Sequence, residues 1–506
     1  MTNSDPSPLG PDPKPNPDQA AQPPQPDTAT AGSESQPQAP QAPGAEPQTP
    51  AADAPSPASY PDPPAHAHAQ SPPVASGQPK SGRVRPETRR LLTIVGSIVL
   101  FAIGFGILSW QIIDNLGHDA YVVGTIAALA PAPLLVGTFV WLGRHKGRPW
   151  LLLAFSFGWG ACVATAIALG VNTGFAVLFE SRDIPMTAVP VVVAPIIEEL
   201  GKFAGPLLVF FFARRHFNGL LDAIVYCGLA AAGFAIVENI LYAGGIYVTG
   251  TEMLSEQAGY ALVTQLVLVR GLATMFAHPL MTGLIAIGLG LAAAKRGRPV
   301  RNFFLISAGV LAGMALHALW NGAATIGAAI DPAAMFAVYL GFMVPLFFTM
   351  VALALWVRAR DARRCETLLV PYVNAGWISP PEVASLATYS RRTAARAWAR
   401  RVAGAEGERH MRDFQRAADD LADVRRRHSV GEPFDPDREF ELLGALRTAR
   451  AYYVQRDPLM PRALWDGTNY QVTFPDGKVR SLSPPHEPVM PIPMNPAPQA
   501  YSQTYA

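Results

Sequence analysis

The residues best able to do chemistry interrupt long apolar stretches of the chain. One stretch contains Glu198, Glu199 and Lys202, in the order Ala-Pro-Ile-Ile-Glu-Glu-Leu-Gly-Lys. Later stretches contain further polar pairs: Glu238 with Asn239, Arg270 with His278, and His317 with Asn321. An unpaired charge at the centre of a lipid bilayer costs about 2.5–3.5 kcal/mol. The charged groups are therefore expected to meet one another or to line a wet cavity.

Carboxylates and imidazoles in such a cavity could hydrolyse a peptide bond. The reaction needs a base that activates water, a group that polarises the carbonyl, and a proton for the leaving amine. Glutamate and histidine can do this themselves, or two histidines and a glutamate from different helices can hold Zn²⁺ with an open position for water. The residue types leave both routes open. The sequence lacks H-E-x-x-H, G-x-S-x-G and paired intramembrane aspartates, so the usual zincin, serine-hydrolase and aspartyl routes have no support.

Helical spacing predicts which of these side chains face the same way. Glu198 and Lys202 are four residues apart, which predicts a salt bridge along one helix face. Glu199 points about 100° away from that face and is expected to be the freer carboxylate. His317 and Asn321 also share a face, as two convergent groups on one helix should.

The elements that must position these residues are membrane-spanning helices. Of the 506 residues, 50% are apolar and only 15% are charged, whereas a soluble domain carries about 25% charged residues. A crossing needs about 20 consecutive apolar residues, and the runs of that kind are 91–113, 121–142, 150–178, 186–213, 220–247, 261–294, 302–325 and 334–358. The fold is therefore expected to be all-α and polytopic, with about eight transmembrane helices.

Neither the net charge nor the cysteines indicate another class of protein. The net charge of +2 comes with basic residues in short clusters between apolar runs, a membrane pattern that argues against nucleic-acid binding. Cys162, Cys227 and Cys365 lie far apart, the first two inside apolar runs. They are expected to be small core residues rather than a disulfide framework or a thiolate metal site.

Basic residues between the apolar runs predict the orientation of the chain. One set of segments is rich in Lys and Arg: 80–90, 144–148, 214–215, 295–301 and 358–364. The opposing loops, 114–120, 179–185, 248–260 and 326–333, contain a single basic residue, Arg182. The positive-inside rule places the basic set in the cytoplasm. We therefore expect a multi-pass protein of the cell membrane with both termini cytoplasmic, which requires an even number of spans.

The regions that flank the membrane domain, 80–364, differ from it in composition. Residues 1–79 and 484–506 are rich in Pro and are expected to be disordered tails. Residues 365–483 are expected to form a cytoplasmic, mostly helical region. Apolar residues recur there at helical spacing, namely Phe414, Ala418, Leu421 and Val424, and then Phe440, Leu443 and Leu446. Residues 471–480, around Pro-Asp-Gly, predict a short β-hairpin.

The depth of the polar residues indicates one shared site. The fourth to seventh apolar runs have their midpoints near residues 199, 234, 278 and 314. Glu199, Glu238, His278 and His317 each lie within about four residues of a midpoint, or about 6 Å along a helix. Since Glu238 and His317 are displaced outward, the site is expected near mid-membrane, toward the extracellular side. Arg270 is expected to compensate charge or to snorkel rather than to catalyse.

These motifs resemble the PrsW family of intramembrane proteases. The motifs follow one another on successive runs as Glu198-Glu199-x-x-Lys202, Phe234-x-x-x-Glu238-Asn239, His278 with Thr282-Gly283, and His317-x-x-Trp320-Asn321. The family is related to the CAAX-processing and bacteriocin-processing membrane peptidases. The chain departs from their pattern at Lys202, where an arginine with another spacing is usual, and at Glu238, where a histidine is usual. The resemblance covers about residues 90–358.

The resemblance implies a peptidase that cleaves membrane-anchored proteins, typically anti-sigma factors, near the outer side of the bilayer. The implied catalytic set is Glu198, Glu199, Glu238, His278 and His317, with Lys202, Asn239 and Asn321 in support. If a metal such as Zn²⁺ is used, its ligands would be Glu238, His278 and His317. The expected partners are the lipid bilayer and a single-pass membrane protein as substrate, with neither nucleic acid nor a small-molecule cofactor.

Two functions of other classes also fit such residues. The chain could be a non-catalytic membrane scaffold, because related folds serve as structural subunits of protease complexes. It could also be a proton-coupled transporter, because glutamate and histidine clusters at mid-membrane relay protons. Against transport, the sequence shows no repeated half with matching broken helices. Against a scaffold, the acids and histidines are more numerous than packing needs.

Overall fold

The computed structural model describes residues 86–144, 147–295, 297–375, 377–453, 463–465, 469–473 and 478–482. The two tails predicted to be disordered, 1–79 and 484–506, lie outside the described residues. The described residues form a helical membrane region up to about residue 358, followed by a smaller region of helices and short strands.

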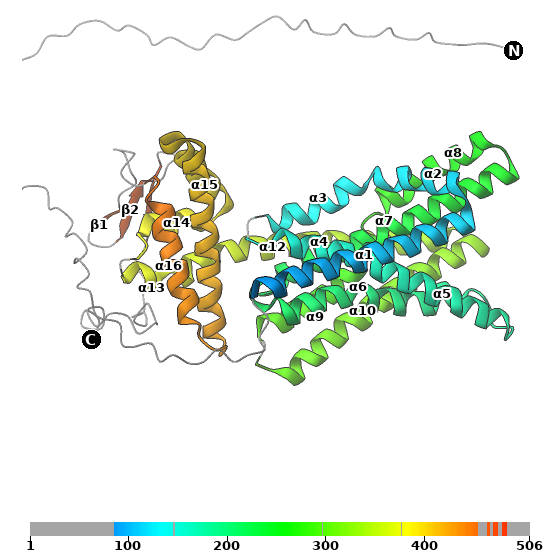
Figure 1. Cartoon of the computed structure of the whole chain (residues 1–506), viewed down its shortest axis with the longest axis horizontal. Helices are drawn as coiled ribbons and strands as arrows, with labels where there is room; N and C mark the ends of the chain where they lie inside the picture. Colours follow the sequence, from blue (N-terminus) through cyan, green and yellow to red (C-terminus); the bar gives the residue numbers. More distant parts are fainter. Residues whose placement is uncertain are drawn as a thin grey trace, which may run out of the picture. The chain divides into compact units, whose positions relative to one another are not determined.

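The membrane region is built from helices, several of which contain a short π-helical segment (η). In chain order these are α1 (Pro86–Leu116), α2 (His118–Leu129), α3 (Ala132–Gly143), α4 (Trp150–Gly158), η1 (Trp159–Ala164), α5 (Thr165–Glu180), η2 (Val189–Val193), α6 (Ala194–Phe212), the 3-10 turn η3 (Arg214–His216), α7 (Leu220–Met253), α8 (Glu256–Leu266), η4 (Val267–Ala273), α9 (Ala277–Ala294), α10 (Pro299–Ala329), α11 (Ala333–Val338), η5 (Tyr339–Met343) and α12 (Val344–Leu368). Figure 1 shows them lying side by side as a bundle.

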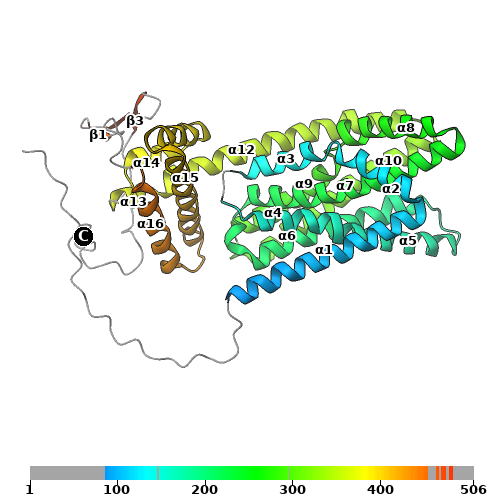
Figure 2. The same ribbon diagram turned by 45° about the horizontal axis from the view of Figure 1, so that its top comes forward.

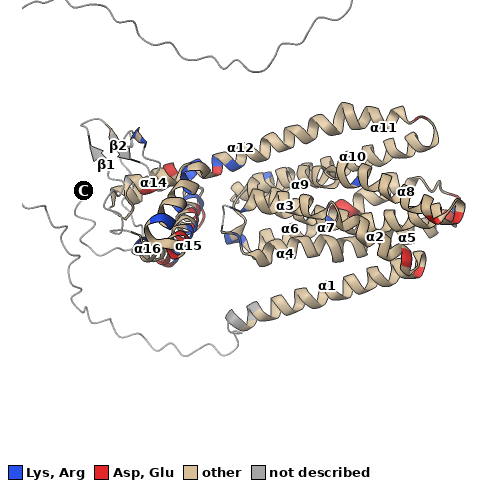
Figure 3. Ribbon diagram, turned by 90° about the horizontal axis from the view of Figure 1, so that it is seen from above, with Lys and Arg blue, Asp and Glu red and all other residues tan. Residues whose placement is uncertain are grey.

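Length and composition allow six helical segments of the described chain to cross a membrane, or seven when the bent pair α2 and α3 counts as one span. Helix α6 has 19 residues and carries Glu198, Glu199 and Lys202, so its charge sets it apart from the others. Away from such residues the bundle is nearly free of charge, whereas Lys, Arg, Asp and Glu gather in α15 and α16 (Figure 3). The all-α, polytopic class is confirmed, and the count of eight spans stays a prediction.

Helix α7 is the buried centre of the bundle (Figure 2). In its most apolar window 94% of the residues are buried, against 11% for α1. Small residues let neighbouring helices approach it closely. A Cβ atom on Gly233 would lie 2.2 Å from the carbonyl oxygen of Phe157 in α4. The position therefore requires glycine, and α7 offers a rigid support for the polar residues that it carries.

Two of the four helices that carry predicted site residues, α6 and α9, follow local breaks, whereas α7 and α10 are continuous. A π-helical turn, η2, leads into α6, and a second, η4, separates α8 from α9. Residues 274–276 then interrupt the helix, so the overlong run at 261–294 consists of three helical pieces rather than one continuous α-helix. π-helical turns widen the backbone and occur frequently at functional sites. Both turns lie beside the residues singled out by the sequence.

The C-terminal region is helical and ends in a small antiparallel sheet. It comprises α13 (Val370–Asn374), α14 (Pro380–Leu386), α15 (Tyr389–Ser429), α16 (Pro436–Arg450) and the strands β1 (Ala463–Trp465), β2 (Tyr470–Thr473) and β3 (Val479–Leu482) in the order β1-β2-β3. The predicted hairpin corresponds to β2 and β3, while β1 adds a strand that the sequence analysis did not predict. Gly404, at φ +66°, kinks α15 in a backbone conformation that favours glycine.

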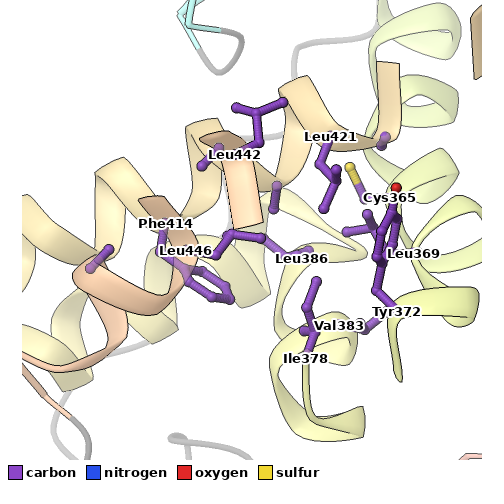
Figure 4. Packing of buried hydrophobic residues seen from close by; sticks show 14 of the residues in the cluster. Cys365, Leu369, Tyr372, Ile378, Val383, Leu386, Phe414, Leu421, Leu442 and Leu446 are labelled. Atoms are coloured by element: carbon purple, nitrogen blue, oxygen red, sulfur yellow. The ribbon is translucent and has the colours of Figure 1, made fainter. Parts of the chain in front are cut away.

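A separate apolar core holds these C-terminal helices together. Leu386, Phe414 and Leu421 pack within it (Figure 4), and the fully buried Arg392 forms an ion pair with Asp419 at 2.6 Å. The predicted apolar stripe of α15 is buried, namely Phe414, Ala418, Leu421 and Val424. In α16 the prediction is wrong at one position: Phe440 is 60% exposed, because the buried face runs instead through Leu442, Leu443, Leu446 and Ala449.

Close packing around α7 can be tested with two glycines of the same helix. Gly233→Ala should lower the melting temperature of the detergent-solubilised protein, because the new methyl group would overlap the backbone of α4, a type of change that costs about 1–3 kcal/mol. Gly245→Ala is the matched control, since a Cβ atom there meets nothing within 4 Å. Equal melting temperatures for the two variants would contradict the close approach of α4 and α7.

Candidate active site in the membrane region

The ammonium group of Lys202 lies at the centre of the polar cluster. Its Nζ donates to Oε1 of Glu199 at 2.9 Å and to Oε2 of Glu198 at 3.4 Å, both on its own helix. It also lies 3.0 Å from Nδ1 of His278 in α9 and 4.0 Å from the ring centre of Phe234 in α7. The predicted Glu198–Lys202 pair is present, but the ammonium has three hydrogen-bonding partners rather than one.

Glu199 is the most tightly held of the carboxylates. Besides the bond from Lys202, its Oε2 accepts from the hydroxyl of Thr282 at 2.7 Å, and its Oε1 lies 3.1 Å from Nδ1 of His317. Its side chain is fully buried. The sequence interpretation that Glu199 is the freer glutamate is therefore wrong, because neighbouring helices α9 and α10 supply partners that spacing along α6 cannot reveal.

Glu198 is held more loosely. Its Oε2 is 3.4 Å from Lys202 and 3.8 Å from Nε2 of His317. Those two distances exceed the usual length of a charge-assisted hydrogen bond, about 2.7–2.9 Å. Glu198 thus retains the capacity to accept a proton or to bind a cation.

Glu238 orients His278 from the opposite side of the ring. Its Oε2 lies 2.6 Å from Nε2 of His278 and accepts from Arg270 at 2.8 Å. Nε of Arg270 donates to Oδ1 of Asn239 at 3.0 Å, and the guanidinium stacks on Tyr242. A hydrogen bond to one ring nitrogen fixes the tautomer and the direction of the other. Nδ1 of His278 is consequently turned toward Lys202 and the carboxylates of α6.

Not every residue singled out by the sequence belongs to this cluster. Asn321 donates to the carbonyl oxygen of Pro190 in η2 at 2.8 Å, so that it ties α10 to the turn that leads into α6. Arg270, which was expected to compensate charge, pairs with Glu238. Thr282 contacts Glu199 although this contact was not predicted. Its signal was available, since Thr282 follows His278 by four residues and shares its helix face.

Three side chains are placed so that they could hold a metal ion together. One ligand atom from each of Glu198, His278 and His317 lies within 4.8 Å of the others. This set differs from the predicted ligands by containing Glu198 in place of Glu238, which faces Arg270 instead. Two imidazoles and one carboxylate with an open position are a donor set that suits catalytic Zn²⁺.

The charge of the cluster is compatible with an added cation. Three carboxylates, those of Glu198, Glu199 and Glu238, face two permanent cations, Lys202 and Arg270. With neutral imidazoles the cluster has one net negative charge in a medium of low dielectric constant, where such a charge is poorly solvated. An imidazolium or a metal ion would balance it.

A small cavity adjoins the cluster. Its volume is about 30 Å³, and its wall includes Asn239, Arg270, His278 and Trp320 together with Pro131, at which α2 and α3 are bent. A space of this size with several polar neighbours can hold a water molecule. The reactant of a hydrolysis therefore has room beside His278.

Comparison with known proteins bears on the same residues. Residues 148–350 match the PrsW family, described as PrsW family intramembrane metalloprotease. This stretch is a PrsW-family domain. No curated protein and no solved structure matches the chain.

The family assignment confirms the resemblance seen in the sequence and shows that the chain is a membrane peptide hydrolase. The PrsW-family match includes α4 to α11 and therefore all the residues of the polar cluster. It leaves α1 to α3 and the C-terminal region outside.

The contact between Arg270 and Glu238 leads to a test of how His278 is positioned. Arg270→Met should lower the rate of peptide cleavage about 10–100-fold, the usual effect of losing a group that orients a reactive histidine. Arg270→Lys should restore part of the rate, because an ammonium can still pair with Glu238. Arg182→Met, in an exposed loop, is the control. If Lys and Met at position 270 are equally inactive while both proteins fold, charge pairing with Glu238 is not what matters.

Proposed function

We propose that the chain hydrolyses peptide bonds of membrane-anchored proteins by activating water with glutamate and histidine groups near the outer side of the bilayer. The observation that carries this proposal is the convergence of Glu198, Glu199, Glu238, His278 and His317, from four helices, on one buried cluster beside a water-sized cavity. Packing alone does not require so many ionisable groups in lipid.

In this mechanism Glu198 is the group that acts on water. It is the carboxylate with the weakest contacts in the cluster, and His317 lies 3.8 Å away as a partner in proton transfer. Glu199 fixes the ring of His317 through Nδ1, while Lys202 and Thr282 keep Glu199 itself in place. Arg270, in the cavity wall, is a donor that can polarise the scissile carbonyl.

The same residues accommodate the metal that the family description implies. Glu198, His278 and His317 would hold it, and Glu238 would orient His278. A bound Zn²⁺ would supply a nucleophilic hydroxide and polarise the substrate carbonyl. In that case Glu198 and His317 would act as ligands, and Glu199 would orient the ring of His317 through Nδ1.

The chain would cross the membrane eight times, with both termini in the cytoplasm of the cell. Helix α6 supports this count, because its 19 residues span about 28 Å at 1.5 Å per residue, close to the thickness of the hydrocarbon core. Its charged side chains are satisfied inside the bundle rather than exposed to lipid. The distribution of Lys and Arg supports the orientation.

The substrates would be proteins anchored by a single transmembrane span, with anti-sigma factors as the class suggested by the resemblance. A single helix can enter the bundle laterally and present its end near the cluster. The cavity is too small for an intact helix, so the end of the substrate helix would have to unwind locally. Within an intact helix, the side chains and hydrogen bonds of the helix shield each peptide bond.

Substitution of the α6 glutamates tests this proposal. Glu198→Gln should reduce cleavage of membrane proteins at least 100-fold, because general acid–base catalysis contributes about 10²–10⁴-fold. Glu199→Gln should also reduce it, by disturbing His317. The measurement compares the new N-termini of membrane-protein fragments between cells that express the wild type and cells that express each variant.

The control is Glu252→Gln at the exposed end of α7, which should cleave like the wild type. Fragment patterns that are identical for the wild type and Glu198→Gln would remove the peptidase mechanism and leave a scaffold as the alternative. Proton flux in liposomes that disappears in Glu238→Gln would instead favour a transporter.

The metal route makes a separate prediction. If Zn²⁺ is used, His317→Ala should retain at least 10-fold less zinc than the wild type after purification, because one of three protein ligands is lost. Elemental analysis of the purified proteins measures this. His118→Ala, at the exposed start of α2, should bind zinc like the wild type. Active wild-type protein that is free of zinc and insensitive to chelators would establish the glutamate–histidine route.

A further inference from the structure

Lys202 occupies an unusual place for a salt-bridge partner. An ordinary pair at i and i+4 on a helix needs only Glu198, but Nζ of Lys202 is also bound to Glu199 and to Nδ1 of His278, 76 residues away in the sequence. The side chain is completely buried, and the ring of Phe234 lies 4.0 Å from Nζ. The ammonium is thus held by partners from three helices.

Two of the atoms that bind Nζ belong to residues of the candidate metal-binding set. Glu198 and His278 are shared by the ammonium and by that set, and only His317 has no direct contact with Nζ. On His278 the shared atom is Nδ1, because Nε2 is bonded to Glu238. The positively charged end of Lys202 therefore lies where the lone pairs of these ligands converge.

We propose that Lys202 and a divalent metal ion are alternative occupants of one cation position, with Lys202 competing for Glu198 and His278. This inference rests on the proposed metal route at the site. Lys202 would be a positioning residue that keeps the donor atoms together when no ion is bound. Metal loading would then require its ammonium to leave Nδ1 of His278.

Simultaneous occupancy is opposed by distance and charge. A zinc–nitrogen bond is about 2.0–2.1 Å long. Since Nζ lies 3.0 Å from Nδ1 of His278, an ion bound to Nδ1 would be within roughly 5 Å of the ammonium. Two positive charges at that separation repel each other strongly inside a protein, where the dielectric constant is low. The lone pair on Nδ1 also cannot accept a hydrogen bond from Nζ and bind a metal ion at the same time.

The test measures metal affinity rather than proteolysis. Zn²⁺ binding to the purified full-length protein in detergent is followed by competition with a chelating dye. Lys202→Met should bind Zn²⁺ at least 10-fold more tightly than the wild type, because the competing charge is gone while Glu198, His278 and His317 remain. Lys202→Arg retains the charge in a bulkier side chain and should bind no more tightly than the wild type.

Melting temperature gives a second measurement if Lys202→Met is unstable. Without the ammonium, Glu198 and Glu199 would be buried without their lysine partner, so this variant should melt at a lower temperature than the wild type. Zn²⁺ should raise its melting temperature more than that of the wild type. Equal affinity for Zn²⁺ in the wild type and Lys202→Met would overturn the inference. Failure of Zn²⁺ to stabilise the variant, or to allow recovery of folded protein, would overturn it as well.

The result can be separated from the proposed function. Tighter binding by Lys202→Met supports the competition even if no membrane protein is cleaved. Conversely, cleavage that depends on Glu198, together with unchanged affinity for Zn²⁺ in Lys202→Met, leaves the peptidase in place and removes only the role of Lys202.

Discussion

The negative charges of three glutamates inside a lipid-embedded bundle must be balanced, and the rest of the structure depends on this constraint. A bilayer offers no water to solvate a carboxylate, so each one must find a cation or a hydrogen-bond donor within the protein. Lys202 does this for Glu198 and Glu199, and Arg270 does it for Glu238. Because the cations lie on α6 and η4, these segments must sit beside α7, α9 and α10. The arrangement of the inner helices follows from that requirement.

Close packing and local breaks reconcile this polar centre with an apolar bundle. Helix α7 is continuous over 34 residues and surrounded by other helices, and glycines such as Gly233 let its neighbours come within backbone contact. The segments that bring the two cations and His278 are interrupted instead, by η2 before α6 and by η4 before α9, whereas α10, which brings His317, is continuous. A regular helix places one side chain every 100° and 1.5 Å. The breaks allow Arg270 and His278, which are eight residues apart, to reach the same oxygen of Glu238.

The sequence predicted the fold class and most members of the cluster, but it missed Thr282 and included Asn321, which binds Pro190 instead. Apolar runs of bilayer length predicted an all-α polytopic chain, and the scarcity of ionisable groups within those runs made each one conspicuous. Partners on other helices could not be predicted, because helical spacing reports only on neighbours within one helix. This is why spacing along α6 predicts a freer Glu199, although Thr282 and His317 bind it. The resemblance to the family, rather than spacing, placed Glu238 instead of Glu198 among the expected metal ligands. The prediction for Phe440 is wrong for a similar reason. Spacing within α16 allows two overlapping apolar faces, and it does not show which of them packs against the neighbouring helices.

The orientation of His278 joins these observations. Glu238, which is itself held by Arg270, binds Nε2 of the ring. The other nitrogen, Nδ1, therefore points toward Lys202 and the carboxylates of α6. A histidine fixed in this way presents a lone pair rather than an N–H group to whatever lies opposite. Lys202 and a metal ion both satisfy a lone pair, whereas a second acceptor such as a carboxylate would not. Glu238 has no contact with Lys202 in this arrangement, yet by orienting His278 it determines which kind of group can bind at the centre of the site. A peptidase of this design therefore needs Glu238 as much as it needs Glu198 and Glu199.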